Sequence, residues 1–145
     1  MTMKRFTSAR GTALLEVALT LPLILLVSVS IFEFGRAYQT MQVLTNAARE
    51  GARVAVLPSQ PQGAVEARVN DYLVAGQVPN ANTATVVVTA TQVSIGTGTT
   101  SGSKVTVSYP FSFMVFQPVA KLVVKNSTLG GGFTMSATAE MRNEQ

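Results

Sequence analysis

The stretch from Gly11 to Leu57, GTALLEVALTLPLILLVSVSIFEFGRAYQTMQVLTNAAREGARVAVL, decides the fold of this chain. Between Glu16 and Glu33 it carries no charged residue, and Leu, Val, Ile and Ala dominate. A membrane-spanning helix needs roughly 20 apolar residues at about 1.5 Å of rise each. The pattern therefore predicts one long helix whose first half spans a membrane.

The polar residues of the span are informative. The uncharged run is slightly short for a span, so one of the bounding carboxylates should lie within bilayer depth. Glu16 is the better candidate, because Glu33 has Arg36 one helical turn away, at the exit. An ionisable residue inside a membrane helix costs at least ~2.5 kcal/mol and usually has a function and a partner. Pro22 removes a backbone donor, which predicts a kink or local unwinding near Ala18.

Beyond Glu33 the helix becomes amphipathic. Apolar residues recur at spacings of three and four, and polar residues fall on the other side. This half should therefore pack one face on a soluble domain. The apolar face comprises Phe34, Tyr38, Met41, Leu44, Ala48, Ala52 and Ala55, and the polar face Arg36, Gln39, Asn46, Arg49, Glu50 and Arg53.

Small residues recur within this second half. Ala48 with Ala52, and Gly51 with Ala55, are pairs four apart that allow another backbone to approach closely. A solvated helix face beside a packed alanine face would explain the same pattern. The sharper hypothesis is a subunit interface, formed by Asn46, Ala48, Arg49, Glu50, Gly51, Ala52 and Arg53.

The basic character of the chain is concentrated at its start. Lys4, Arg5 and Arg10 precede the apolar run, and the remaining eight Lys and Arg residues nearly balance seven Asp and Glu. Basic residues beside a membrane segment keep their side in the cytoplasm. We therefore expect the leader in the cytoplasm and everything after Phe34 on the far side. Because no basic patch with interleaved aromatics is present, no nucleic-acid partner is expected.

Composition argues against an enzyme. The chain has no Cys and no His, which removes disulfides, thiol nucleophiles and the commonest general base and metal ligand. Asp71 is the only Asp, and the Glu residues are scattered. The Gly-rich run from Gly96 to Ser103 lacks the Lys and helix of a phosphate cradle. We expect no catalytic residues, metal site, cofactor or small-molecule substrate.

After Pro58, which should stop the long helix, the pattern predicts a small α+β domain. A short second helix should be stopped by Gly76. The period then switches to two, which indicates about three strands of an antiparallel sheet. We expect the helix at 64–74 and strands at 85–95, 104–109 and 133–142, with a flexible connection at 96–103, strand 104–109 ended or placed at an edge by Pro110, a turn at 130–132, and no clear prediction for 111–124.

Two motifs carry a resemblance. Gly11 is followed by Thr12, with Glu16 fifth counting from Thr12, and this resembles the processing site of type IV prepilins, which are cut after a Gly and carry Glu at the fifth position of the mature chain. The stretch EFGRAYQTMQVLTNAAREGARVAVL resembles the TadE-like family, small pilin-like proteins of tight-adherence (Tad) pilus systems, whose usual wording is close to E-x-GR … TNAAREGAR. Residues 141–144 resemble the closing residues of the same family more weakly.

The resemblance implies a pilin-like fold and a minor pilin or pseudopilin that takes part in pilus assembly. A prepilin peptidase would cut after Gly11 and methylate the new amine of Thr12, and Glu16 would pair with an N-terminal amine as subunits gather. The implied partners are this peptidase, other pilins, the assembly machinery and the lipid bilayer of the bacterial inner membrane. The expected parts are a cytoplasmic leader at 1–11, a transmembrane helix at 12–34, an amphipathic extension at 35–57 and a periplasmic domain at 58–145.

Two other interpretations stay open. In one, residues 28–30, Ser-Val-Ser, form a signal-peptidase site that releases a secreted soluble binding module. Against it, a signal peptide gains nothing from Glu16, and the amphipathic helix continues in phase through the cut. In the other, the chain is an unprocessed bitopic anchor that presents an adhesive β domain. The mature N-terminus distinguishes all three.

Overall fold

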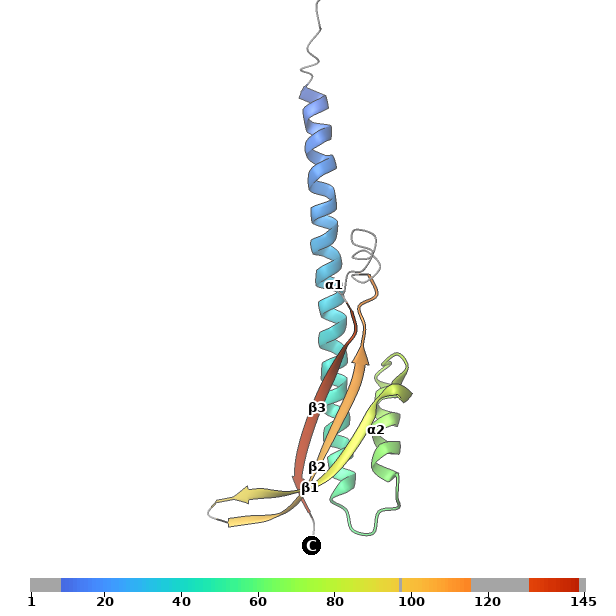
Figure 1. Ribbon diagram of the computed structural model, residues 1–145, viewed down its shortest axis with the longest axis vertical. Helices are drawn as coiled ribbons and strands as arrows, with labels where there is room; N and C mark the ends of the chain where they lie inside the picture. Colours follow the sequence, from blue (N-terminus) through green and yellow to red (C-terminus); the bar gives the residue numbers. More distant parts are fainter. Residues whose placement is uncertain (1–8, 97, 116–130, 144–145) are drawn as a thin grey trace, which may run out of the picture.

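The computed structural model describes residues 9–96, 98–115 and 131–143. A long helix, α1 (Ala9–Ala55), runs the length of the molecule, and a small α+β domain packs on its second half alone (Figure 1). The predicted fold class is confirmed: one long helix, one short helix and a three-stranded antiparallel sheet. The predictions for most of the leader, for most of 111–124 and for Gly130 fall outside the described residues.

Helix α1 is continuous over 47 residues, with Pro22 inside it. The local unwinding predicted near Ala18 is wrong, because α1 is helical without interruption there. Hydroxyls within the apolar half bond back along the helix, as in Thr20 to the carbonyl of Glu16 at 2.9 Å, so these polar groups are satisfied internally. The helix ends at Ala55, two residues earlier than predicted, in a turn in which the N–H of Leu57 donates to Val54.

Helix α2 (Ala64–Ala75) is the predicted second helix. Its Val69 and Leu73 are fully buried, four residues apart on one face. Gly76 follows as the C-cap, and its N–H donates to the carbonyl of Tyr72 at 2.9 Å. A short 3₁₀ turn, η1 (Ala81–Thr83), then leads into the sheet.

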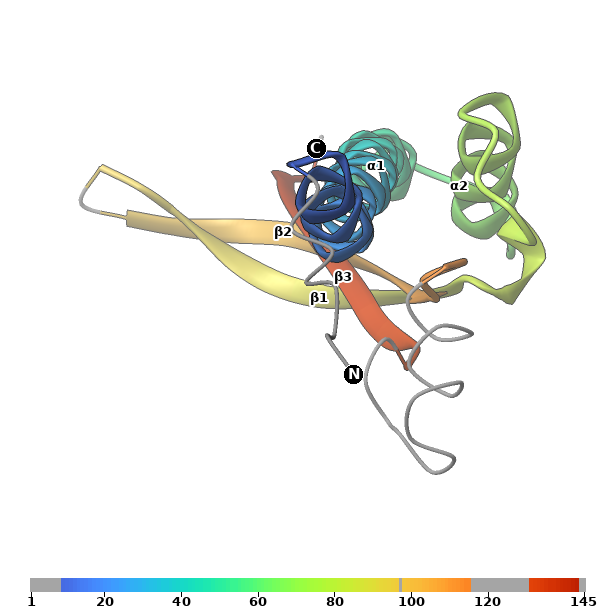
Figure 2. The same ribbon diagram turned by 90° about the horizontal axis from the view of Figure 1, so that it is seen from above.

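The sheet consists of β1 (Thr85–Ile95), β2 (Gly98–Phe111) and β3 (Phe133–Arg142) in the order β1-β2-β3. The first and last strands lie where the alternation predicted them. Both helices lie on the same side of the sheet (Figure 2), where α1 packs on β2 and β3, and α2 packs on α1. The core lies between that face and the helices, and Val105, Val107 and Phe111 of β2 are buried in it.

Strand β2 is longer than predicted at both ends. The predicted flexible connection at 96–103 is wrong, because β2 begins at Gly98 and its residues up to Gly102 pair with β1. Thr99 and Thr100 are β-branched and favour extended backbone, which the Gly content of the run obscured. At the other end β2 passes Pro110, which faces only β3, since the pairing with β1 ends at Ser108. A strand position with one neighbour tolerates proline.

The predicted apolar stripe of α1 is correct in its later part and wrong at its start. Leu44, Ala48 and Ala52 are fully buried, as expected. At the start of the second half, the buried face of α1 is displaced by one residue from the predicted face. The largest apolar side chains there are therefore exposed to solvent. Phe34, Tyr38 and Met41 are exposed, whereas Glu33, Ala37 and Thr40 are buried.

Candidate assembly site

The first half of α1 exposes its apolar side chains. From Leu14 to Phe32 the large ones other than the half-buried Val29 are 46–72% exposed. The most apolar window of the helix has a mean hydropathy of 2.4, with none of it buried inside the chain. By length and composition α1 is able to cross a membrane. Apolar surface on this scale needs a cover of lipid or protein.

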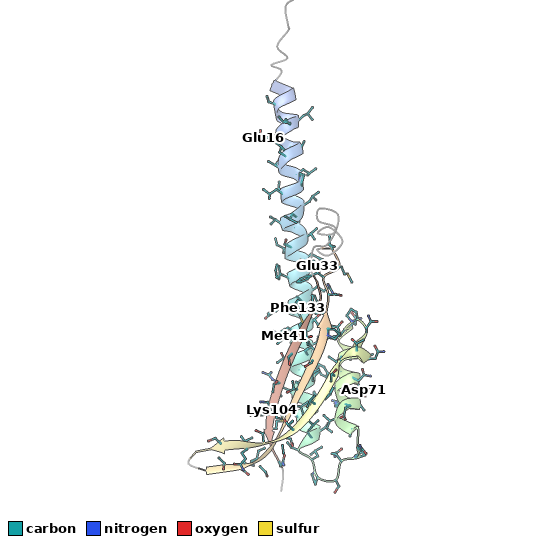
Figure 3. All side chains as sticks on the ribbon, in the orientation of Figure 1. Glu16, Glu33, Met41, Asp71, Lys104 and Phe133 are labelled. Carbon is teal, nitrogen blue, oxygen red and sulfur yellow. The ribbon has the colours of Figure 1, made fainter. Side chains whose placement is uncertain are left out.

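The predicted processing residues and the predicted intramembrane carboxylate lie on this exposed half. Gly11 and Thr12 fall within the first described turn of α1, and Glu16 lies one turn further on, exposed. Figure 3 shows Glu16 far from the small domain. Thr12 and Glu16 are four apart and therefore share one face of the helix.

Glu33 marks the point where the helix meets the small domain (Figure 3). Its side chain is completely buried. The N–H groups of Met114 and Val115 donate to its Oε1 at 2.8 and 2.7 Å, and a guanidinium nitrogen of Arg36 donates to its Oε2 at 3.0 Å. A buried carboxylate is tolerated when it is paired and hydrogen-bonded in this way.

Arg36 completes the same arrangement from one turn further along α1. It donates to the backbone carbonyl of Ser112, and its guanidinium carbon lies 4.4 Å from the centre of the Phe111 ring. Glu33 and Arg36 thus hold residues 111–115 against α1 by three hydrogen bonds to backbone and one ring contact. We call this arrangement, Glu33 and Arg36 with residues 111–115, the clasp.

The clasp was missed by sequence reasoning, which placed Arg36 one helical turn from Glu33 but treated Glu33 as a charge at the membrane exit. The helical period alone does not single out Glu33, because Phe34 and Tyr38 fit it equally well. Glu33 lies four and seven residues before Ala37 and Thr40, so it continues the buried face of α1 towards the membrane. Its backbone partners are 81 and 82 residues away in the sequence, and no local pattern identifies them.

Four phenylalanines gather beside the clasp. The ring of Phe113 lies 5.4 Å from that of Phe111, 5.8 Å from that of Phe133 and 6.1 Å from that of Phe34, measured between centroids. Tilted and edge-to-face pairs at these separations stabilise one another beyond the area that they bury. The cluster joins α1, the end of β2 and the start of β3 into one unit.

Tyr109 fixes the neighbouring part of β2. Its hydroxyl donates to the carbonyl of Pro79 at 2.6 Å, which ties β2 to the connection between α2 and η1. Burial raises the pKa of Tyr109 above its ordinary value of 10.0, and the nearby charge of Arg36 opposes that shift. The hydroxyl is therefore neutral and serves as a structural donor.

Residues 11–53 match the family model described as TadE-like protein. This N-terminal segment is similar to TadE-like proteins. The resemblance of the sequence to the TadE-like family is thereby confirmed over the part of α1 that contains the Glu33–Arg36 pair and the run TNAAREGAR. Neither the comparison with curated proteins nor that with solved structures gives a match.

The small residues at the end of the TadE-like segment face the chain's own domain. Ala48, Gly51 and Ala52 are buried. A Cβ added to Gly51 would lie 2.6 Å from Cγ2 of Val69 and 3.2 Å from Cγ1 of Val105. These residues therefore allow α2 and β2 to approach α1 closely, which accounts for them without a second subunit.

The charged residues of that run lie elsewhere. Glu50 accepts a hydrogen bond from Arg68 of α2 at 3.0 Å, in a partly exposed ion pair. Arg49 and Arg53 are exposed, and Asn46 is half-buried. Within the run TNAAREGAR this outer side is the part open to another molecule, so an interface at this run would use the two arginines rather than the small residues.

The described residues hold no cluster of three or more Asp, Glu, His or Cys side chains that could bind a metal ion. Their buried ionisable groups, Glu33 and Tyr109, are engaged in the contacts above. The arrangement binds backbone and aromatic groups and holds elements together.

Proposed function

We propose that this chain is a minor pilin or pseudopilin that takes part in the assembly of a Tad, type IV-like pilus. The observation that carries the proposal is the exposed apolar half of α1 within a segment that matches TadE-like proteins. Such a helix suits two environments, a bilayer and a bundle of similar helices. A pilin-like subunit uses the first before assembly and the second after it.

The N-terminal residues have specific roles in this proposal. A prepilin peptidase cuts after Gly11, which makes Thr12 the first residue of the mature chain and the site of amine methylation. Glu16 is then one turn from the new end of the helix, at bilayer depth. A carboxylate in that position requires a cation, and the terminal amine of a neighbouring subunit supplies one.

The orientation follows from the same parts. The basic leader at 1–11 stays in the cytoplasm, residues 12–34 cross the bacterial inner membrane once, and the extension at 35–57 carries the domain at 58–145 in the periplasm. The partners are the prepilin peptidase, other pilins, the pilus assembly machinery and lipid. Catalysis has no part in this function.

The test is the chemistry of the mature N-terminus. The full chain is expressed in a cell with a Tad system, extracted from the membrane fraction and analysed by intact-mass and peptide mass spectrometry. Thr12 is the expected first residue. An intact Met1 would indicate an unprocessed anchor, and a chain that starts at Ile31 and leaves the membrane on carbonate extraction would indicate a secreted module; either result overturns the proposal.

The same preparation tests the role of Glu16. The Glu16→Ala variant should insert in the membrane normally but recover less of the other pilins on purification, because the pairing with the amine is lost. Glu66→Ala, which removes an exposed carboxylate of α2, is the matched control and should leave recovery unchanged. Equal recovery for both variants would refute the pairing role.

A further inference from the structure

An apolar patch lies at the end of the small domain nearest the membrane-spanning half of α1. Its side chains come from α1, from the segment after β2 and from the start of β3, and all are more exposed than core residues. They are Phe34 at 62%, Met114 at 60%, Phe133 at 45% and Val115 at 36%. We call these four residues the foot.

The length of α1 places the foot at the edge of the bilayer. A hydrocarbon core of about 30 Å takes up roughly 20 helical residues, so a span that begins at Thr12 ends near Ile31. Glu33 is in the next turn, and its carboxylate binds the backbone of Met114 and Val115 directly. The foot therefore lies within about one helical turn of the point where α1 leaves the hydrocarbon.

The charges beside the foot are hidden from that surface. The side chain of Glu33 is completely buried, and that of Arg36 is 20% exposed and is paired with it. The apolar surface thus continues from Ile31 and Phe32 of the span onto Phe34 and Met114 of the foot. Tyr38, one turn beyond Phe34, is 69% exposed, as suits an amphipathic ring at the level of lipid headgroups.

The foot is also rigidly connected to α1. The clasp fixes residues 114 and 115 by their backbone, and Phe133 is held through Phe111 and Phe113, with ring centroids 5.5 and 5.8 Å away. Figure 3 shows Phe133 at the end of the sheet below Glu33. The domain therefore presents the foot at a fixed depth and a fixed angle to the helix axis.

We propose that the foot rests in the interfacial layer of the bilayer from which α1 emerges, so that lipid covers Met114, Val115, Phe133 and Phe34. Continuity with the spanning half of α1 identifies lipid as the occupant, because the same apolar surface runs from one to the other. Burial of these side chains adds to membrane binding and sets the tilt of the domain. The inference rests on the membrane anchorage contained in the proposed function, and on no other part of it.

Single tryptophans test the depth of the foot, since the chain has none of its own. The full-length chain is reconstituted in phosphatidylcholine vesicles as Met114→Trp and Phe133→Trp, with Leu23→Trp as the control for the span. Val74→Trp, at an exposed position of α2, is the control for the water-facing domain. Emission is measured with phospholipids brominated at shallow acyl positions, and separately with aqueous acrylamide.

Both foot variants should lose several-fold more emission to the brominated lipid than Val74→Trp does, and should resist acrylamide. Quenching by lipid equal to that of Val74→Trp would overturn the inference, whether the foot is then open to acrylamide, as in water, or shielded from it, as under a second copy of the chain. If Leu23→Trp is also unquenched by lipid, the anchorage and with it the proposed function fail. If Leu23→Trp alone is quenched, only the position of the foot is wrong.

Discussion

The two halves of α1 belong to one uninterrupted helix and have opposite relations to the rest of the chain. The first half is the more apolar and lies almost wholly exposed, whereas the second half carries most of the charges and contributes Leu44, Ala48 and Ala52 to the core. The most deeply buried charge, Glu33, lies at their junction. Burial within this chain therefore follows the docking of the small domain, and the apolar half depends on lipid or on other helices.

The largest expected effect is a difference in the free energy of unfolding between alanine variants of two leucines, one in each half of α1. Leu44→Ala removes a fully buried side chain and should lower the free energy of unfolding by about 2 to 5 kcal/mol. Leu23→Ala removes a side chain that is 63% exposed and should change it by less than about 0.5 kcal/mol. Urea unfolding of the detergent-solubilised chain, followed by the near-ultraviolet signal of the tyrosines, measures both.

The expected difference is refuted if Leu23→Ala lowers the free energy of unfolding as much as Leu44→Ala does. That result would mean that the first half of α1 packs on the chain's own domain in solution. A loss for Leu44→Ala below about 1 kcal/mol would instead mean that the core collapses around the deletion without a cavity.

Much of the fold was predictable because its signals are local. The uncharged run of α1, the alternation in β1 and β3 and the stop at Gly76 each depend on neighbours within a few residues. The phase of the buried face of α1 was not predictable, because it depends on Met114 and Val115, which bind Glu33 across more than 80 positions. Phe34 and Tyr38 fit the helical period as well as Glu33 does, and only the docked segment decides between them.

The candidate site divides in the same way. Gly11, Thr12 and Glu16 form a linear motif, which a single sequence displays completely, although their roles remain predictions. The small residues at 48–52 also gave a clear pattern, but the pattern states only that something approaches closely. That the approaching groups include Val69 and Val105 of the same chain is information that spacing does not contain.

The junction itself provides the second test. Glu33→Ala leaves the N–H groups of Met114 and Val115 and the guanidinium of Arg36 without their acceptor. The free energy of unfolding should fall by about 3 kcal/mol. This is near the lower end for breaking a buried ion pair, because the side chain of Arg36 is 20% exposed to solvent. Glu33→Gln, which retains an acceptor for the backbone, should lose less.

Glu50→Ala is the matched control for Glu33→Ala, since it also breaks a Glu–Arg pair at 3.0 Å, but a pair whose side chains are 30% and 52% exposed. Glu50→Ala should lower the free energy of unfolding by no more than about 1 kcal/mol. Equal losses for the two variants, measured by the same urea unfolding, would show that the clasp contributes no more than a surface ion pair.

The smallest effect concerns two glycines of α1. An alanine at Gly51 places its Cβ 2.6 Å from the stiff side chain of Val69. Replacing Gly by Ala in a helix ordinarily stabilises the protein by about 1 kcal/mol, but overpacking at this contact costs about 1 to 3 kcal/mol. Gly35 has nothing within 4 Å of such a Cβ, so Gly35→Ala should show the gain alone. In the same detergent, the unfolding temperature should therefore fall for Gly51→Ala and rise for Gly35→Ala.

The sign for Gly51→Ala also decides what the small residues are for. If they serve packing within the chain, the variant lowers the unfolding temperature of the isolated subunit, and any loss of recovered pilins follows from that. If they serve an interface with another subunit, the isolated subunit is as stable as wild type or more stable, and only the recovery of pilins falls. The contact with Val69 favours the first result, because a neighbouring helix could not occupy that space unless α2 moved away from α1.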